Sequence, residues 1–329
     1  QDTFEGIYLI WFVIGAVVLI LVLGALISSL VLKTSEKKLV SKFSSSKFKN
    51  MVMGGLIALS TLLIIISSLV VDYAEKRQLE SVEYSLNTLL STTHQRLNGW
   101  VKYELDHLEQ IGKNKELVEL VEQLLLLPQE REALLASPLQ SQIRKFFLER
   151  KGKFGDAGFF VISPSSISLS SQRDDNIGIE NLIHQSRPEL LQDVFQGNSV
   201  FVPPIRSDIN GTAVNGNGLK PPTMFFAVPI TNSDGIVIAI MTKRINFEGS
   251  FSSILSSGFI GKSGETYAID ESGMLLSNVR FEDDLKRIGL IAKNERASLQ
   301  MRISDPGKNL LKENGIKGQE EQWPLTLMA

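Results

Sequence analysis

The sequence lacks cysteine, and only three of its 329 residues are histidine. Without cysteine the chain cannot form disulfides, thiolate zinc sites, iron–sulfur clusters or a cysteine nucleophile. The histidines are His94, His107 and His184, and none has a partner at the spacing of a zinc motif such as H-E-x-x-H. We therefore expect neither a metal centre nor a cofactor.

A strong excess of charge of one sign is also missing, since the formal net charge is −2. This balance argues against a nucleic-acid partner. The acidic pairs Asp174–Asp175 and Asp283–Asp284 lie beside arginines in polar segments, as solvated or salt-bridged residues usually do. No nucleophile elbow of the G-x-S-x-G kind occurs between Gly158 and Ser171. We predict no catalytic residues, and no enzymatic activity for this stretch of chain.

Long hydrophobic runs, in contrast, are present. Residues 7–32 and 51–71 each contain no charged side chain. Both runs exceed the roughly 20 residues that a helix needs to cross a bilayer. They are also longer than the apolar part of a signal peptide, which spans about 7 to 15 residues. We expect two transmembrane helices, at 1–33 and 51–72.

The segment between the two runs indicates their orientation. Residues 33–50 carry six lysines and a single acid, Glu36. Short basic loops stay in the cytoplasm, where anionic lipid lies next to them. We therefore expect a cytoplasmic loop at 34–50 in a multi-pass protein of the inner (plasma) membrane, with residues from about 72 onward extracytoplasmic.

A long amphipathic helix should follow the second run. From Leu79 to Ile111 apolar residues recur in steps of three and four, with polar residues between them. No proline interrupts this pattern before Gly112, so the helix can continue the membrane helix. We expect a stalk helix at 73–112. Its apolar face fits either the seam of a homodimer or packing against its own domain.

Beyond the stalk the pattern changes from helical to extended. Residues 115–127 and 129–151 are helical in pattern, with Pro138 as a possible restart. Short β-rich runs then follow at 158–162, 167–171, 199–205, 224–230 and 235–243. The segment from Thr231 to Gly235 predicts a hairpin between the last two. Helices followed by a mostly antiparallel sheet predict an α+β fold.

The sequence also repeats itself once. Residues 159–173 align with 266–280 without a gap and share five identities. Both copies are followed by an Ile–Gly pair, at Ile177–Gly178 and Ile288–Gly289. We interpret the two stretches as hairpins of related modules.

The second copy contains the sequence SGETYAIDESGMLLS at 263–277. We predict that Asp270 to Gly273 forms the turn between two short strands, TYAI and MLLS. Gly273 would supply the positive φ that such a turn needs. Its carboxylates are then turn formers rather than a catalytic pair.

A membrane helix, a stalk and two hairpin-rich modules together resemble the double Cache sensor regions of bacterial transmembrane receptors. The stretches GFFVISPSSISLSSQRDDNIG and SGETYAIDESGMLLSNVRFEDDLKRIGL are similar to the sensor part of membrane histidine kinases and nucleotide cyclases. The resemblance covers about 72–329 and is most specific at 263–290. It implies two tandem PAS-like modules with antiparallel sheets, a membrane-distal one at 113–250 and an incomplete membrane-proximal one at 251–329.

The resemblance further implies extracytoplasmic sensing of a small molecule and signalling across the membrane. The expected partners are a small ligand, the lipid bilayer and a second copy bound through the stalk. The output domain, a histidine kinase in our first interpretation, would lie outside this sequence. A nucleotide cyclase or another signalling output remains an alternative, as does a membrane-anchored interaction module that binds no metabolite. The signature of the amino-acid-binding subgroup is missing, because no Trp–Tyr pair follows Arg144.

The first module holds the candidate ligand-binding residues. A pocket needs apolar lining and a few directed polar groups. An arginine would suit an anionic group on the ligand. The alternative is a framework role, with the phenylalanines in the core and Arg173 paired to Asp175. The candidates are Phe160, Ser171, Arg173, Asp175, Phe226 and Thr242.

Overall fold

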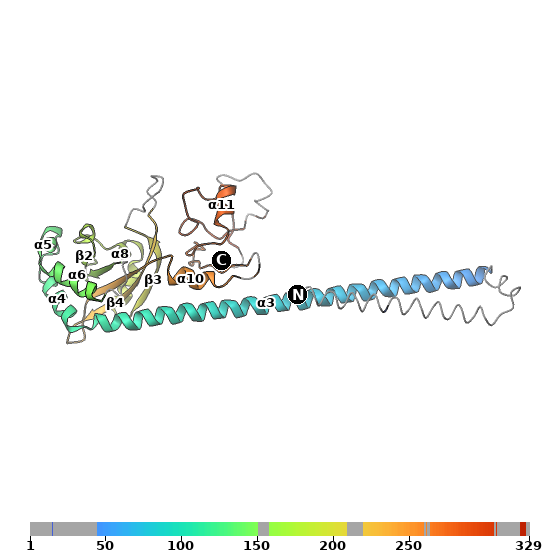
Figure 1. The fold of residues 1–329 in the computed structure, drawn as a ribbon, viewed down its shortest axis with the longest axis horizontal. Coiled ribbons are helices and arrows are strands. Elements are labelled where there is room, and N and C mark those ends of the chain that lie inside the picture. The colour runs from blue at the N-terminus through green and yellow to red at the C-terminus, as the bar shows by residue number, and fades with distance from the viewer. Residues whose placement is uncertain are drawn as a thin grey trace. The chain divides into compact units, whose positions relative to one another are not determined.

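The structure is a computed structural model that describes residues 15, 45–150, 158–208, 220–259, 261, 264–305, 307 and 323–326. The chain divides into two compact units, 1–84 and 85–329. Figure 1 shows the described helices and strands. Of the predicted first membrane helix only Gly15 is described, and it is helical. The rest of that prediction and most of the basic loop lie outside the described residues.

One helix, α3 (Ser46–Gly112), contains the predicted second membrane helix and the predicted stalk. It runs without interruption to Gly112, as expected from the absence of proline. By length and composition it is apolar enough to cross a membrane. Gly112 ends the helix where a Cβ atom would lie 2.7 Å from the carbonyl oxygen of Pro229.

Three short helices follow α3, and they confirm the helical pattern of the sequence. They are α4 (Lys115–Leu125), α5 (Arg131–Ala136) and α6 (Leu139–Glu149). Asn114 caps α4, because its side-chain oxygen accepts hydrogen bonds from the backbone N–H groups of Glu116 and Leu117. Pro138 separates α5 from α6, so the chain restarts there as a new helix.

The five strands of the described residues form one antiparallel sheet, which confirms the predicted α+β class. They are β1 (Phe159–Ile162), β2 (Ser168–Ser171), β3 (Val200–Arg206), β4 (Pro222–Thr231) and β5 (Val237–Ile245). Their order across the sheet is β2-β1-β5-β4-β3. The predicted β4–β5 hairpin is present, and Gly235 has a φ of +79° in its turn.

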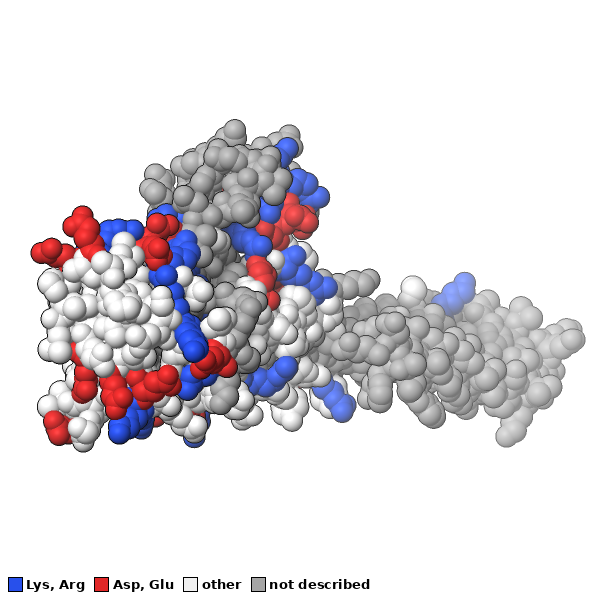
Figure 2. All heavy atoms as spheres, turned by 60° about the vertical axis from the view of Figure 1, so that its left-hand side comes forward, with Lys and Arg blue, Asp and Glu red and all other residues white. Residues whose placement is uncertain are grey.

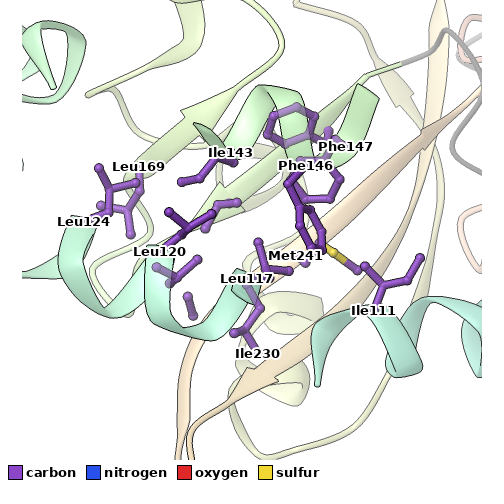
Figure 3. Packing of buried hydrophobic residues seen from close by; sticks show 14 of the residues in the cluster. Ile111, Leu117, Leu120, Leu124, Ile143, Phe146, Phe147, Leu169, Ile230 and Met241 are labelled. Atoms are coloured by element: carbon purple, nitrogen blue, oxygen red, sulfur yellow. The ribbon is translucent and has the colours of Figure 1, made fainter. Parts of the chain in front are cut away.

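The sheet is covered on both sides by helices. On one side the end of α3, α4 and α6 pack against β4 and β5 through apolar residues that include Leu117, Ile143 and Met241 (Figure 3). On the other side α8 (Leu182–Ser186) and α9 (Pro188–Phe195) cover Phe160, Phe225 and Ile240. Since successive residues of a strand point to opposite faces, each strand contributes to both cores.

The remaining described elements are η1 (Asp174–Asn176), α10 (Ser250–Ser256) and α11 (Glu282–Ile288). The described part of 264–305 contains isolated bridges, such as Ile269 with Leu275, rather than named strands. The predicted hairpin TYAI and MLLS is therefore reduced to its turn and these bridges. A small apolar cluster of Leu275, Ile291 and Ala297 lies beside it.

The turn of this hairpin is as predicted, and the first copy has the same turn. Gly273 has a φ of +77° and donates its N–H to the Asp270 carbonyl at 2.9 Å. Ser166, its aligned counterpart, has a φ of +63° and donates to the Ser163 carbonyl at 2.9 Å. The repeat thus extends to backbone conformation. A tandem pair of complete modules and the boundaries 113–250 and 251–329 stay predictions.

The Ile–Gly part of the repeat is different from what its spacing suggested. Gly178 (φ +73°) donates its N–H to the Ser168 carbonyl at 2.9 Å. The residue that makes the equivalent bond in the second copy is Leu299 (φ +60°), whose N–H lies 2.8 Å from the Leu275 carbonyl. Gly289 instead ends α11. The two Ile–Gly pairs that follow the copies therefore have different structural roles.

Candidate arginine–aspartate ligand site

A buried arginine, Arg244 of β5, marks the candidate site. It lies on the side of the sheet that α8 and α9 cover and is 8% exposed. Its guanidinium carbon is 5.6 Å from the ring centroid of Phe160 and 5.0 Å from that of Phe225. Contact with aromatic rings favours a cation, but a charge this deeply buried also needs hydrogen-bonding partners.

Asp208, two residues after β3, supplies the main partner. The Nη2 group of Arg244 donates to Asp208 Oδ1 at 2.6 Å. Asp208 Oδ2 accepts from Arg173 Nη2 and, at 2.6 Å, from Asn176 Nδ2. Both carboxylate oxygens are therefore engaged, each by a different guanidinium. We call Arg173, Asn176, Asp208 and Arg244 the arginine–aspartate cluster.

Two buried hydroxyl groups complete the surroundings of Arg244. Its Nη1 group donates to Ser207 Oγ at 3.2 Å and to Thr223 Oγ1 at 3.4 Å. Both hydroxyl-bearing residues are almost fully buried. Such groups can donate as well as accept, so they can also serve an anion next to the arginine.

The charges of the cluster do not cancel. Burial would raise the pKa of Asp208, but Arg244, Arg173 and Asn176 together hold this pKa below its ordinary value. Burial lowers the pKa of Arg244, and Asp208 opposes that effect. Because arginine remains protonated in proteins, two cations face one anion. Among the described residues the cluster therefore carries one more positive than negative charge, and Arg173, whose side chain is 37% exposed, is the cation that an anionic ligand could pair with.

Of the predicted site residues, Arg173 belongs to the cluster and Asp175 does not. The framework interpretation paired these two residues, and that pairing is wrong because Arg173 bonds to Asp208. Asp175 is exposed, and its backbone carbonyl accepts from Arg131 Nη1 at 3.1 Å. Its carboxylate lies 4.0 Å from Arg131 Nη2.

The other four predicted residues are divided between the two sides of the sheet. Phe160 and Thr242 lie on the side of the cluster, and the Phe160 N–H donates to Thr242 Oγ1 at 3.0 Å. Ser171 is opposite Phe160 in the neighbouring strand. Phe226 lies on the other side, with its ring 5.1 Å from that of Trp100. The six residues therefore do not form one constellation, and their role in binding a ligand stays a prediction.

Sequence reasoning missed Arg244, Asp208 and Asn176. The predicted last strand stopped at Lys243, one residue before the arginine. Alternation along β5 was the available signal, because Arg244 shares a face with the buried Ile240. Asp208 fell in a segment interpreted as a polar loop, where an aspartate is unremarkable.

Polar contacts next to the cluster reach other parts of the same unit. Two residues before Asp208, the Nη2 group of Arg206 donates to the Leu299 carbonyl at 2.7 Å. One residue before Arg244, Lys243 Nζ donates to Glu104 Oε2 of α3 at 2.7 Å. Residues next to the cluster in the sequence therefore contact the region 264–305, through Arg206, and α3, through Lys243.

The described histidines and acids offer little to a metal ion. His184 Nδ1 lies 2.6 Å from Glu180 Oε1, and His94 Nε2 lies 3.2 Å from Asn98 Nδ2. Within the described ranges no group of three or more histidine or acidic side chains is placed to hold a metal ion. Figure 2 shows basic and acidic side chains next to each other on the described part of one face.

No protein-family model matches the chain, and no curated protein matches it. Solved structures with a similar fold include the sensor domain of the Vibrio cholerae histidine kinase DctB, at 15% identity and a TM-score of 0.40, over 61% of this chain and 67% of that one. The ligand-binding domain of the Pseudomonas aeruginosa amino-acid chemoreceptor PctC, in complex with GABA, has 15% identity and a TM-score of 0.34, over 64% and 77%. The periplasmic domain of Vibrio cholerae LuxQ has 14% identity and a TM-score of 0.33, over 59% and 76%.

These neighbours are sensor and ligand-binding domains, the class of protein that the sequence motifs resemble. Likeness at this level identifies neither a ligand nor an output domain. The functional assignment below therefore rests on the residues of this chain.

Proposed function

We propose that the chain is the extracytoplasmic sensor part of a membrane receptor and that it binds a small anionic molecule. The observation that carries the proposal is the arginine–aspartate cluster. Two guanidinium groups share one carboxylate on a largely buried face of the sheet. An anionic ligand can pair with these two guanidinium groups, which Phe160 and Phe225 flank on the side of Arg244.

The strand β5 connects the arginine–aspartate cluster to α3, so that ligand binding at the cluster can affect the helix. Arg244 lies on the cluster side, whereas the preceding Lys243 bonds to Glu104 of α3 on the other side. Both members of the Lys243–Glu104 pair are largely buried, so the pair is sensitive to small shifts of the strand. A ligand moves this equilibrium only by its difference in affinity for the two positions of the strand.

We propose that the receptor is a homodimer joined along the stalk part of α3. Apolar side chains there remain exposed at helical spacing, namely Leu79, Val82, Leu86 and Leu90. A second copy would cover this stripe, as in a coiled coil. These exposed residues support an interface between two copies. The alternative, packing within one chain, applies to Leu97, which packs beside Phe251 of α10.

The remaining parts of the proposal concern the membrane and the output. We propose two membrane spans with a basic cytoplasmic loop in the inner membrane, a second module at 251–329, and a histidine kinase as the output of the receptor. A nucleotide cyclase output is the alternative within the same class. An interaction module that binds no metabolite is the alternative from another class.

Ligand binding can be tested by thermal shift on the full chain in detergent with a library of small carboxylate and phosphate metabolites. A ligand at 100 times its dissociation constant should add about 2.7 kcal/mol of stability. The variant Arg173→Gln should lose the shift. Arg287→Gln, which alters an exposed pair with Asp284, should keep it. If no compound stabilises the wild type, the interaction module becomes the better assignment.

The orientation in the membrane can be tested with reporter fusions after Lys42 and after Gly112. A reporter active only in the cytoplasm should work at the first position and fail at the second. The same result at both positions would contradict the proposed topology.

A further inference from the structure

The Asp208 carboxylate holds the position that a bound carboxylate would take. One of its oxygens accepts from Arg244 and the other from Arg173. Guanidinium groups bind the carboxylates of small ligands through the same pair of planar oxygens. The cluster is therefore already occupied by an anion that belongs to the chain itself.

The charge balance separates this arrangement from a purely structural ion pair. A buried pair is stable when its charges cancel, because an uncompensated buried charge is costly. Here one carboxylate serves two cations, the buried Arg244 and Arg173, whose side chain is 37% exposed, so the second cation is open to an anion from solution. The neutral groups around it, Asn176, Ser207 and Thr223, can bond equally to an added carboxylate.

The position of Asp208 in the chain would also allow its carboxylate to be replaced by that of a ligand. It follows β3, which ends at Arg206, so no strand pairing holds its own backbone. Its side chain is 16% exposed, whereas that of Arg244 is 9% exposed. Arg244, in contrast, lies within β5 and is paired with Phe225 of β4. The arginine is the fixed member of the pair, and the aspartate is the member that can leave.

We propose that Asp208 is an internal competitor, and that a small carboxylate binds this protein by displacing the Asp208 side chain from Arg173 and Arg244. The inference deepens the proposed sensing function and rests on it for its biological role. Asp208 then sets the ligand concentration at which the sensor responds. The less time the two arginines spend free of Asp208, the lower is the apparent affinity for the ligand.

Displacement also gives the ligand a mechanical consequence. Arg206, two residues before Asp208, holds the Leu299 carbonyl at 2.7 Å. A change in the position of Asp208 would therefore act on this contact between the end of β3 and the region 264–305. The same exchange alters the surroundings of Arg244, whose neighbour Lys243 bonds to α3.

The test uses Asp208→Ala in the full chain in detergent, with acetate as the probe and chloride at equal ionic strength as the reference. Without its internal carboxylate the variant should be less stable, and acetate should restore stability in a saturable manner. If Asp208 leaves the arginines about one tenth of the time, acetate should bind the variant about tenfold more tightly than the wild type. Acetate binding that is equal or weaker in the variant overturns the proposal.

Two further variants control for misfolding of Asp208→Ala and for general anion binding. Asp208→Asn keeps the size of the side chain and removes its charge, so it should also bind acetate more tightly than the wild type, and it carries the test if the alanine variant does not fold. Asp270→Ala is the matched control, because Asp270 also pairs with an arginine, Arg187, at 3.4 Å. A gain of acetate affinity in Asp270→Ala equal to that in Asp208→Ala would show general anion binding and overturn the proposal.

The outcomes also separate this proposal from the proposed function. Tighter acetate binding by Asp208→Ala, with no metabolite that stabilises the wild type or the variant, supports the internal competitor and contradicts the sensing function. A metabolite that stabilises the wild type, without any gain for acetate in either Asp208 variant, supports sensing and overturns the competitor.

Discussion

The two copies of the hairpin, at 159–171 and 266–278, share a turn but not a sheet. Ser166 and Gly273 have nearly the same left-handed φ, and each closes its turn with a 2.9 Å hydrogen bond. The first copy forms β1 and β2 inside the five-stranded sheet, whereas the second forms isolated bridges. A turn is encoded by a few neighbouring residues, but a strand needs partners from elsewhere in the chain.

Burial explains the difference between the copies. All four residues of β1 are buried, because β5 lies beside them and helices cover both faces. In the second copy Leu275 and Leu276 are the buried apolar residues, and Leu275 packs with Ile291 and Ala297 in a small cluster. Polar contacts such as Arg206 to the Leu299 carbonyl contribute to its position. A hairpin with so little apolar burial gains little strand stability.

Removing a large side chain from each core should give the largest contrast. Phe226→Ala removes a fully buried ring and should destabilise the sheet by about 3–5 kcal/mol. Leu275→Ala should loosen the second hairpin and leave the sheet intact. Hydrogen exchange should show faster exchange of β4 and β5 amides only in Phe226→Ala. If the β4 and β5 amides also exchanged equally fast in Leu275→Ala, the sheet and the second hairpin would unfold as one unit.

Asp208 and Asp270, which each pair with an arginine, should show a smaller difference in their contributions to stability. These contributions depend on pH. Asp208 and Asp270 both have a pKa below the ordinary value, although burial opposes this shift in each. A lowered pKa stabilises the fold above the unfolded value of about 3.9, and this contribution is lost as the pH falls through the folded value.

Asp208→Asn should cost about 1.5–3 kcal/mol at pH 7, as expected for hydrogen bonds to charged groups. Asp270→Asn should cost less, because an amide oxygen can still accept the hydrogen bonds from Ser272 and Met274, and only the 3.4 Å pair with Arg187 loses its charge. Urea unfolding at pH 7 and near pH 3 measures both effects, and each variant should lose less stability on acidification than the wild type. An unchanged pH dependence in Asp208→Asn would show that its carboxylate does not stabilise the fold.

Exchanging the turn residues should give the smallest effects, of opposite sign. Ser166→Gly should stabilise the first turn by about 1 kcal/mol, because glycine adopts a positive φ without the strain of a side chain. Gly273→Ser should destabilise the second turn by a similar amount. Thermal unfolding of both single variants and of the double variant would measure this. A loss of stability in Ser166→Gly would contradict the inference that the positive φ of Ser166 is strained.

Much of the local structure could be predicted from the sequence. The end of α3 at Gly112, the restart at Pro138 and the β4–β5 turn at Gly235 all follow from the properties of glycine and proline. The positive φ of Gly273 was predicted in the same way. Each of these features depends on residues within a few positions of one another.

The candidate site could not be predicted, apart from Arg173. Asp208 is 36 positions from Arg244 and 35 from Arg173, and the sequence shows no reason for them to meet. Their contact depends on the insertion of β1 between β2 and β5, which places the segment after β2 near the end of β5. Strand order is decided by which apolar faces pack together.

The apolar runs, the helices, the turns and the repeat of the hairpin follow from the amino-acid sequence, because these features depend on local propensity and periodicity. Which hairpin became part of a sheet, and which carboxylate joined the two arginines, could be read only from the folded chain. Both depend on long-range packing, in which apolar burial brings distant segments together and leaves their charged groups to find partners.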